Sequence, residues 1–220
     1  MTSDRRDSAA ARSTTSYALL GLLSVRSWTT YELAKQVQRS LKWFWPRAER
    51  KLYDEPKRLV ADGLATSARE HTGQRPRTVY EITAGGREAL RRWLDEPSAP
   101  RTVEFEAMIK VFFADAGSLE QLDATLVRIE QEAGTRLNEL ATMAAEGVAG
   151  ATAFPGRLHL SAVGLRLQVE QELGVLRGSR WARDQLLTWS AADEPGEWDH
   201  RAALVDVIAL ARSEPPGERT

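Results

Sequence analysis

Positive charges recur at helical spacing between residues 46 and 63, which is the densest cationic stretch of the chain. On a helix these side chains would share one face, interrupted only by Asp54: Arg47, Arg50, Lys51, Lys57 and Arg58. The opposite face is mostly apolar and includes Leu52 and Leu59. A row of cations can neutralise phosphates, and the major groove of B-DNA is wide enough to admit a helix. The alternative for this stretch alone is an ordinary surface helix with a solvated charged face.

The ends of this stretch suit a helix, but its interior contains a proline. Pro46 fits the first helical turn, and Gly63 fits the position just past the end. Pro56 removes the amide bond back to Leu52 and crowds that carbonyl. The sequence therefore predicts a helix over 46–63 that is kinked at Pro56.

A second group of cations lies in a predicted turn. Residues 64–70 and 78–83 have the alternation of short strands, and residues 71–77 between them contain glycine and proline. Arg75 and Arg77 lie at the far side of this turn. The pattern predicts a hairpin with a basic tip, which would meet a DNA backbone or an adjacent minor groove.

Three further helices would position these two elements. A leucine-rich helix is expected over residues 17–25 with Ser16 as its cap, and Thr29 with Glu32 forms a capping box for a helix that ends near residue 40. Lys35 and Arg39 lie on the outward side of that helix, near the phosphates of bound DNA. Thr83 caps a helix over residues 84–95. The order of three helices, a hairpin and a helix predicts a winged helix-turn-helix domain.

The charge distribution supports an anionic partner for this part of the chain. Residues 35–92 contain 14 Lys and Arg against 7 Asp and Glu, whereas residues 93–220 contain 12 against 21. A basic first half with an acidic second half favours nucleic acid on the first half alone.

The second half of the chain has helical periodicity throughout. After a proline-containing linker at residues 97–100, apolar residues step by three or four from Leu119 to Ala144, and a second long helix is expected over residues 158–189. Residues 147–156, rich in glycine, would join the two as an antiparallel hairpin. The two long helices carry more apolar surface than they can bury against each other, which predicts that the chain forms a homodimer. The alternative is that this surface forms a core within one chain. A mainly α fold follows, with residues 1–14 and 213–220 as disordered tails and domains over residues 15–97 and 101–212.

Other classes of function have little support in the sequence. The chain has no cysteine, and its three histidines, His71, His159 and His200, do not have metal-ligand spacing. We therefore expect neither catalysis nor a cofactor or metal. No apolar run reaches 18 residues, so a cytoplasmic protein without a membrane segment is expected. Four tryptophans offer flat walls for a small aromatic effector, with core packing as the alternative: Trp93, Trp181, Trp189 and Trp198.

Four blocks of sequence, in this order and spacing, resemble the PadR family of bacterial transcriptional regulators. They start at Tyr17 (YALLGLL), Thr30 (TYELA), Leu52 (LYDEPKRLVADGL) and Gly73 (GQRPRTVYEITAGGREAL). The resemblance implies a winged-helix homodimer that binds a palindromic DNA operator, usually as a repressor and sometimes released by a small effector.

Within that expectation each cation has a role. Arg47, Arg50 and Lys51 are assigned to the groove, because the first half of a recognition helix reaches base edges. Lys57 and Arg58 are assigned to phosphates. The competing hypothesis is a winged-helix protein-interaction module that does not bind DNA.

Overall fold

A computed structural model describes residues 12–41, 52–72, 75–101 and 104–213. The chain divides into two compact units, residues 1–101 and 102–220, which we treat separately. The three residues that were predicted to enter the DNA groove lie outside the described residues: Arg47, Arg50 and Lys51.

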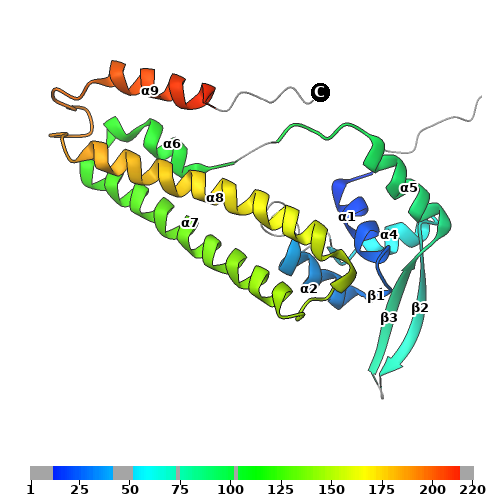
Figure 1. The fold of residues 1–220 in the computed structure, drawn as a ribbon. Coiled ribbons are helices and arrows are strands. Elements are labelled where there is room, and N and C mark those ends of the chain that lie inside the picture. The colour runs from blue at the N-terminus through cyan, green and yellow to red at the C-terminus, as the bar shows by residue number, and fades with distance from the viewer. Residues whose placement is uncertain (1–11, 42–51, 73–74, 102–103, 214–220) are drawn as a thin grey trace, which may run out of the picture. The chain divides into compact units, whose positions relative to one another are not determined.

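The first unit contains helices and a small antiparallel sheet (Figure 1). Its elements are α1 (Thr14–Leu23), β1 (Trp28–Thr29), α2 (Thr30–Ser40), α4 (Glu55–Ala61), β2 (Ala65–Thr72), β3 (Arg75–Ile82) and α5 (Ala84–Asp95). This is the predicted winged helix-turn-helix architecture.

The sheet has the strand order β1-β3-β2, with β3 in the centre. Sequence reasoning predicted the β2–β3 hairpin but missed β1, whose two residues pair with Tyr80 and Val79. The strands extend into the predicted turn at 71–77, because Thr72 pairs with Arg75. The prediction that Arg77 lies in a turn was therefore wrong, since Arg77 is a strand residue opposite Glu70.

Side-chain caps start α1, α2 and α5 of this unit. The capping box of Thr29 and Glu32 is confirmed, and the Thr83 hydroxyl accepts from the backbone N–H of Gly86 at the start of α5. The cap of α1 is Ser13 rather than the predicted Ser16. The predicted tail over residues 1–14 is thus too long, because α1 already begins at Thr14.

Leucines from three helices form the core of the first unit. Leu19, Leu20 and Leu23 of α1, Leu33 of α2 and Leu59 of α4 are each at most 1% exposed. Because these residues recur at helical spacing, each helix turns one apolar face inward.

The predicted single helix over residues 46–63 is interrupted. Tyr53 and Asp54 form a turn, and the α4 helix begins only at Glu55. Pro56 lies in the first turn of α4, where its missing N–H needs no partner, so it starts a helix instead of kinking one. Gly63 has a φ of 71° just beyond the helix, as the sequence predicts.

The second unit is helical. Its helices are α6 (Glu106–Phe112), α7 (Leu119–Val148), α8 (Leu158–Leu186) and α9 (His200–Arg212), with 3-10 turns η1 (Ala114–Ala116) and η2 (Pro155–Arg157). A capping box of Ser118 and Gln121, whose three-residue spacing is typical of this motif, starts α7. The helices α7 and α8 lie side by side and run antiparallel, as Figure 1 shows.

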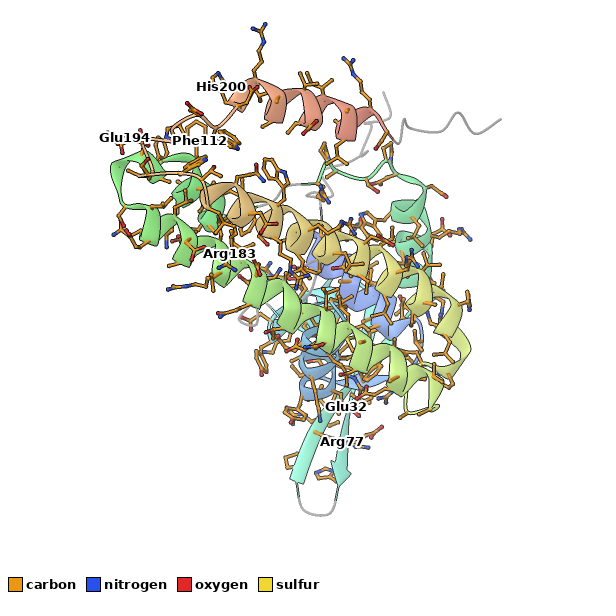
Figure 2. All side chains as sticks on the ribbon, turned by 60° about the vertical axis from the view of Figure 1, so that its left-hand side comes forward. Glu32, Arg77, Phe112, Arg183, Glu194 and His200 are labelled. Carbon is orange, nitrogen blue, oxygen red and sulfur yellow. The ribbon has the colours of Figure 1, made fainter. Side chains whose placement is uncertain are left out.

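Apolar contacts and ion pairs join α7 to α8. Leu122, Leu126 and Ile129 of α7 pack with Leu186 of α8. Arg183 of α8, labelled in Figure 2, extends toward α7 and donates to the carboxylates of Asp123 over 2.7 Å and Glu130 over 3.3 Å. These carboxylates raise the pKa of Arg183, and the hydrogen bond that Arg183 donates to Asp123 has the largest effect. Within the part of the chain that the structure describes, no helix is both long and apolar enough to cross a membrane.

Candidate nucleic-acid interface

Two helices of the first unit display predicted DNA-binding cations. Lys35 and Arg39 are exposed on α2, as the sequence predicts. Lys57 and Arg58 are exposed on α4, with 72% and 78% of their side chains accessible. The fold thus leaves all four cations within reach of a ligand.

The α4 cations form only loose ion pairs within the protein. Lys57 lies 3.6 Å from Asp54, and Arg58 lies 3.7 Å from Glu55, each on its own helical turn. An exposed pair such as Lys57 with Asp54 contributes roughly 0–1 kcal/mol. Exchanging such a partner for a phosphate therefore costs little.

A buried carboxylate fixes the start of α4 against α1. The Glu55 side chain accepts hydrogen bonds from the hydroxyl of Ser16 and, at 3.4 Å, from that of Ser13. Glu55 is only 6% exposed, and Ser16 is 4% exposed. This contact sets where Lys57 and Arg58 lie on the surface, because they follow Glu55 by less than one helical turn.

The outer part of the β2–β3 hairpin extends beyond the short strand β1. The β1 strand pairs with β3 only at Tyr80 and Val79, so residues 69–72 and 75–78 form a two-stranded ribbon, which we call the outer hairpin. Four residue pairs at about 3.3 Å per residue give it a reach of about 13 Å. Figure 1 shows the hairpin projecting away from the helices of its unit.

Arg77 has acidic neighbours on the outer hairpin. Its Nη2 donates to Glu70 Oε2 over 2.7 Å across the two strands. The Glu32 carboxylate at the start of α2 lies close enough for Arg77 to contribute to lowering its pKa (Figure 2). The positive charge of Arg77 is therefore largely neutralised by carboxylates of the protein itself. Arg75 starts β3, but its side chain is outside the described residues.

Glu32 also joins α2 to the segment before β1. The backbone N–H of Thr29 donates to its carboxylate and lowers the pKa of Glu32, an effect that partial burial opposes and that Arg26 reinforces. Arg26 lies 3.7 Å from Glu32 and places its guanidinium 3.5 Å from the centre of the Trp28 ring. Sequence reasoning missed Arg26, whose position depends on the pairing of β1 with β3.

The sequence analysis also missed Arg69, an exposed residue of β2. It pairs in register with Thr78 and belongs to the outer hairpin. Only the strand register reveals it, because the predicted basic tip was confined to residues 71–77.

The four predicted effector-binding tryptophans are divided between the two units, with Trp93 in the first and the other three in the second. Trp93 of the first unit stacks on Tyr17 with ring centres 4.8 Å apart. In the second unit Trp189 and Trp198 meet edge to face at 5.3 Å, and Trp181 is 46% exposed. The indole N–H of Trp198 donates to Gln185. The indole N–H of Trp189 is buried and has no hydrogen-bond partner among the described residues.

A separate hollow of about 600 Å³ lies between α7 and α8. Its charged lining includes both acidic and basic side chains: Glu120, Asp123, Glu130, Asp184, Arg180 and Arg183. None of the four tryptophans lines it.

Comparison with known proteins places the first unit in a family. Residues 19–92 match the model of the Transcriptional regulator PadR-like family. The Negative transcriptional regulator PadR of Bacillus subtilis (strain 168) is 27% identical over 126 residues, which are 56% of this chain and 69% of that protein. The first unit therefore resembles PadR-like transcriptional regulators over residues 19–92.

Solved structures share the PadR-like fold. Bacillus subtilis PadR in complex with operator DNA superposes with a TM-score of 0.68 at 22% identity, covering 79% of this chain and 99% of that one. The same protein in complex with p-coumaric acid gives a TM-score of 0.63 at 22% identity, over 78% and 97% of the two chains. The fold shared with these structures includes the long helices, because the matched region extends well beyond the PadR-like domain.

Proposed function

We propose that this PadR-like regulator is a repressor that binds a palindromic operator as a homodimer. The observation that carries the proposal is the winged-helix unit itself, in which α2, α4 and the hairpin all present exposed cations within a stretch of 14 basic and 7 acidic residues. The segment before α4 supplies the groove contacts through Arg47, Arg50 and Lys51, while Lys35, Arg39, Lys57, Arg58 and Arg75 are the proposed backbone contacts. The naming of Bacillus subtilis PadR as a negative regulator supports repression.

The proposed homodimer accounts for exposed apolar side chains of the second unit. Val163 and Leu167 of α8 are each 61% exposed, and Phe112 of α6 is 79% exposed. Apolar surface of this extent on long helices favours burial against a second copy of the chain. Two winged-helix units related by a two-fold axis would match a palindromic operator.

The proposal is tested by titrating the purified protein with duplex DNA from the promoter region of its own gene. We expect tight binding that weakens steeply with salt, because phosphate contacts release counterions. Arg50→Ala should weaken binding by about 1–3 kcal/mol and relax base preference at one or two positions. Arg92→Ala is the matched control, since Arg92 is an exposed cation near the end of α5.

Two outcomes would contradict the proposal. A wild-type protein that ignores duplex DNA even in dilute salt would favour a protein-interaction module. Equal losses in Arg50→Ala and Arg92→Ala would show that general charge, and not a groove contact, determines binding.

We further propose that a small aromatic acid releases the DNA. The complex of Bacillus subtilis PadR with p-coumaric acid supports this ligand class. The Trp189–Trp198 pair offers ring faces and one indole N–H without a partner among the described residues, which suit a flat ring with an oxygen acceptor. We expect p-coumaric acid to raise the apparent Kd for DNA and Trp189→Phe to abolish that response; an unchanged Kd in the wild type would refute the effector proposal.

A further inference from the structure

The outer hairpin has two sides with different charge. Side chains alternate between the faces of a strand, and residues paired across two strands share a face. Arg69, His71 and their partners Thr78 and Pro76 therefore lie on one side, while Glu70 and Arg77 lie on the other.

The side that carries Arg69 continues the face that packs on the helices. Ala65, Tyr80 and Ile82 lie on that face and are 2%, 4% and 6% exposed, and the strands contact α1, α2 and α4. We call this the helix-facing side. Past β1 the described residues on this side are exposed or half-buried, and Arg69 is among the exposed ones.

The two arginines differ in their charge environment. Arg77 is on the outward side, where Glu70 lies within 2.7 Å and would repel an approaching phosphate. Arg69 is exposed and makes no ion pair or hydrogen bond with any residue that the structure describes. A phosphate near Arg69 therefore meets a cation that no carboxylate of the described residues pairs with.

We propose that, of these two arginines, Arg69 is the DNA-contacting residue and Arg77 is a positioning residue. Arg69 contacts a backbone phosphate, while the pair of Arg77 with Glu70 keeps the two strands of the outer hairpin in register. This assignment rests on the proposed DNA-binding function and refines the role given to Arg77.

The test compares three variants in salt titrations against the same operator-containing duplex. Arg69→Gln should reduce the magnitude of the slope of log K against log salt by about 1.8, because each of the two protomers loses one phosphate contact that contributes about 0.9. The double variant Glu70→Gln/Arg77→Gln removes a neutral pair and should leave the slope unchanged. Arg92→Gln, near the end of α5, removes one positive charge just as Arg69→Gln does, and it should also leave the slope unchanged.

The outcomes separate this inference from the proposed function. If the wild type does not bind the duplex, the function itself fails. If the wild type binds and Arg69→Gln has the wild-type slope, or only the double variant lowers it, the assignment of Arg69 is overturned. Circular dichroism of each variant checks that the wing substitutions leave the domain folded.

Discussion

Single residues with buried polar partners fix the geometry of the DNA-binding unit. Glu55 is a buried carboxylate at the contact between α1 and α4, where the hydroxyls of Ser16 and Ser13 donate to it. A buried carboxylate that loses a donor keeps its desolvation cost without compensation. The orientation of α4 therefore depends on a hydroxyl group 39 residues earlier in the chain.

Ser16→Ala should lower the free energy of unfolding by about 1–3 kcal/mol, because it removes the principal donor to Glu55. Urea denaturation of the variant and the wild type measures the difference. Ser67→Ala, at an exposed position of β2, is the control and should stay within about 0.5 kcal/mol. Equal stabilities of Ser16→Ala and the wild type would mean that Glu55 is adequately solvated without this contact.

Glu32 should make stability depend on acid pH. Its folded pKa lies below the ordinary 4.5, first because of the Thr29 backbone N–H, so its contribution is present above that value and is lost as the pH falls through the folded pKa. Glu32→Gln should make the fall in unfolding free energy below about pH 4.5 shallower. Because 40% of the side chain is exposed, the change should stay below about 1 kcal/mol. Identical pH profiles from urea titrations would contradict this role.

At the scale of the element, local signals were predictable and long-range pairings were not. The capping boxes at Thr29 and Ser118 follow from residues three apart in the sequence, and both are present. The β1 strand was missed because its two residues become a strand only by pairing with Tyr80 and Val79, some fifty positions later.

The same distinction applies to the candidate site. The exposure of Lys35 and Arg39 followed from helical periodicity alone. The strand register, which the sequence does not specify, was needed to find two features of the hairpin. One is the ion pair of Arg77 with Glu70, and the other is that Arg69 lies on the opposite side of the outer hairpin from Arg77. Pro56 was recognised as an anomaly, but its placement at the start of α4 depends on the turn at Tyr53 and Asp54.

The contact between α5 and the base of the hairpin leaves no space for a side chain at Gly86. A Cβ there would collide with the Leu64 carbonyl oxygen and lie 2.8 Å from Ile82 Cγ1. Gly86→Ala should destabilise the domain by about 1–3 kcal/mol through this overpacking. Gly85→Ala is the matched control, because its nearest neighbour would be 3.6 Å away and alanine favours a helix. Thermal unfolding of both variants tests the prediction, and equal Tm values would refute it.

At the scale of the whole molecule, the second unit exposes a large part of its apolar side chains. The helices α6, α8 and α9 all carry exposed large apolar side chains, and no residue of α9 is buried. A helix with apolar residues on most sides is normally covered on those sides. Assembly into the proposed homodimer would provide that cover.

Val163→Asp should weaken the dimer and, with it, the affinity for a two-fold operator. Light scattering should give twice the 24.5 kDa chain mass for the wild type and a smaller weight-average mass for the variant at low micromolar concentration. Ser161→Asp is the control on the opposite side of α8 and should remain dimeric. A monomeric wild type would refute the homodimer.

The alternation of side chains along the outer hairpin also limits how the wing can change in length. Lengthening each strand by one residue between Ser67 and Arg69 would turn the arginine to the outward side, whereas two residues in each would restore it. Wing length is therefore constrained to even increments wherever a cation must stay on the helix-facing side. In related regulators with longer wings, each strand should therefore be longer by an even number of residues between the position paired with Tyr80 and the position of Arg69.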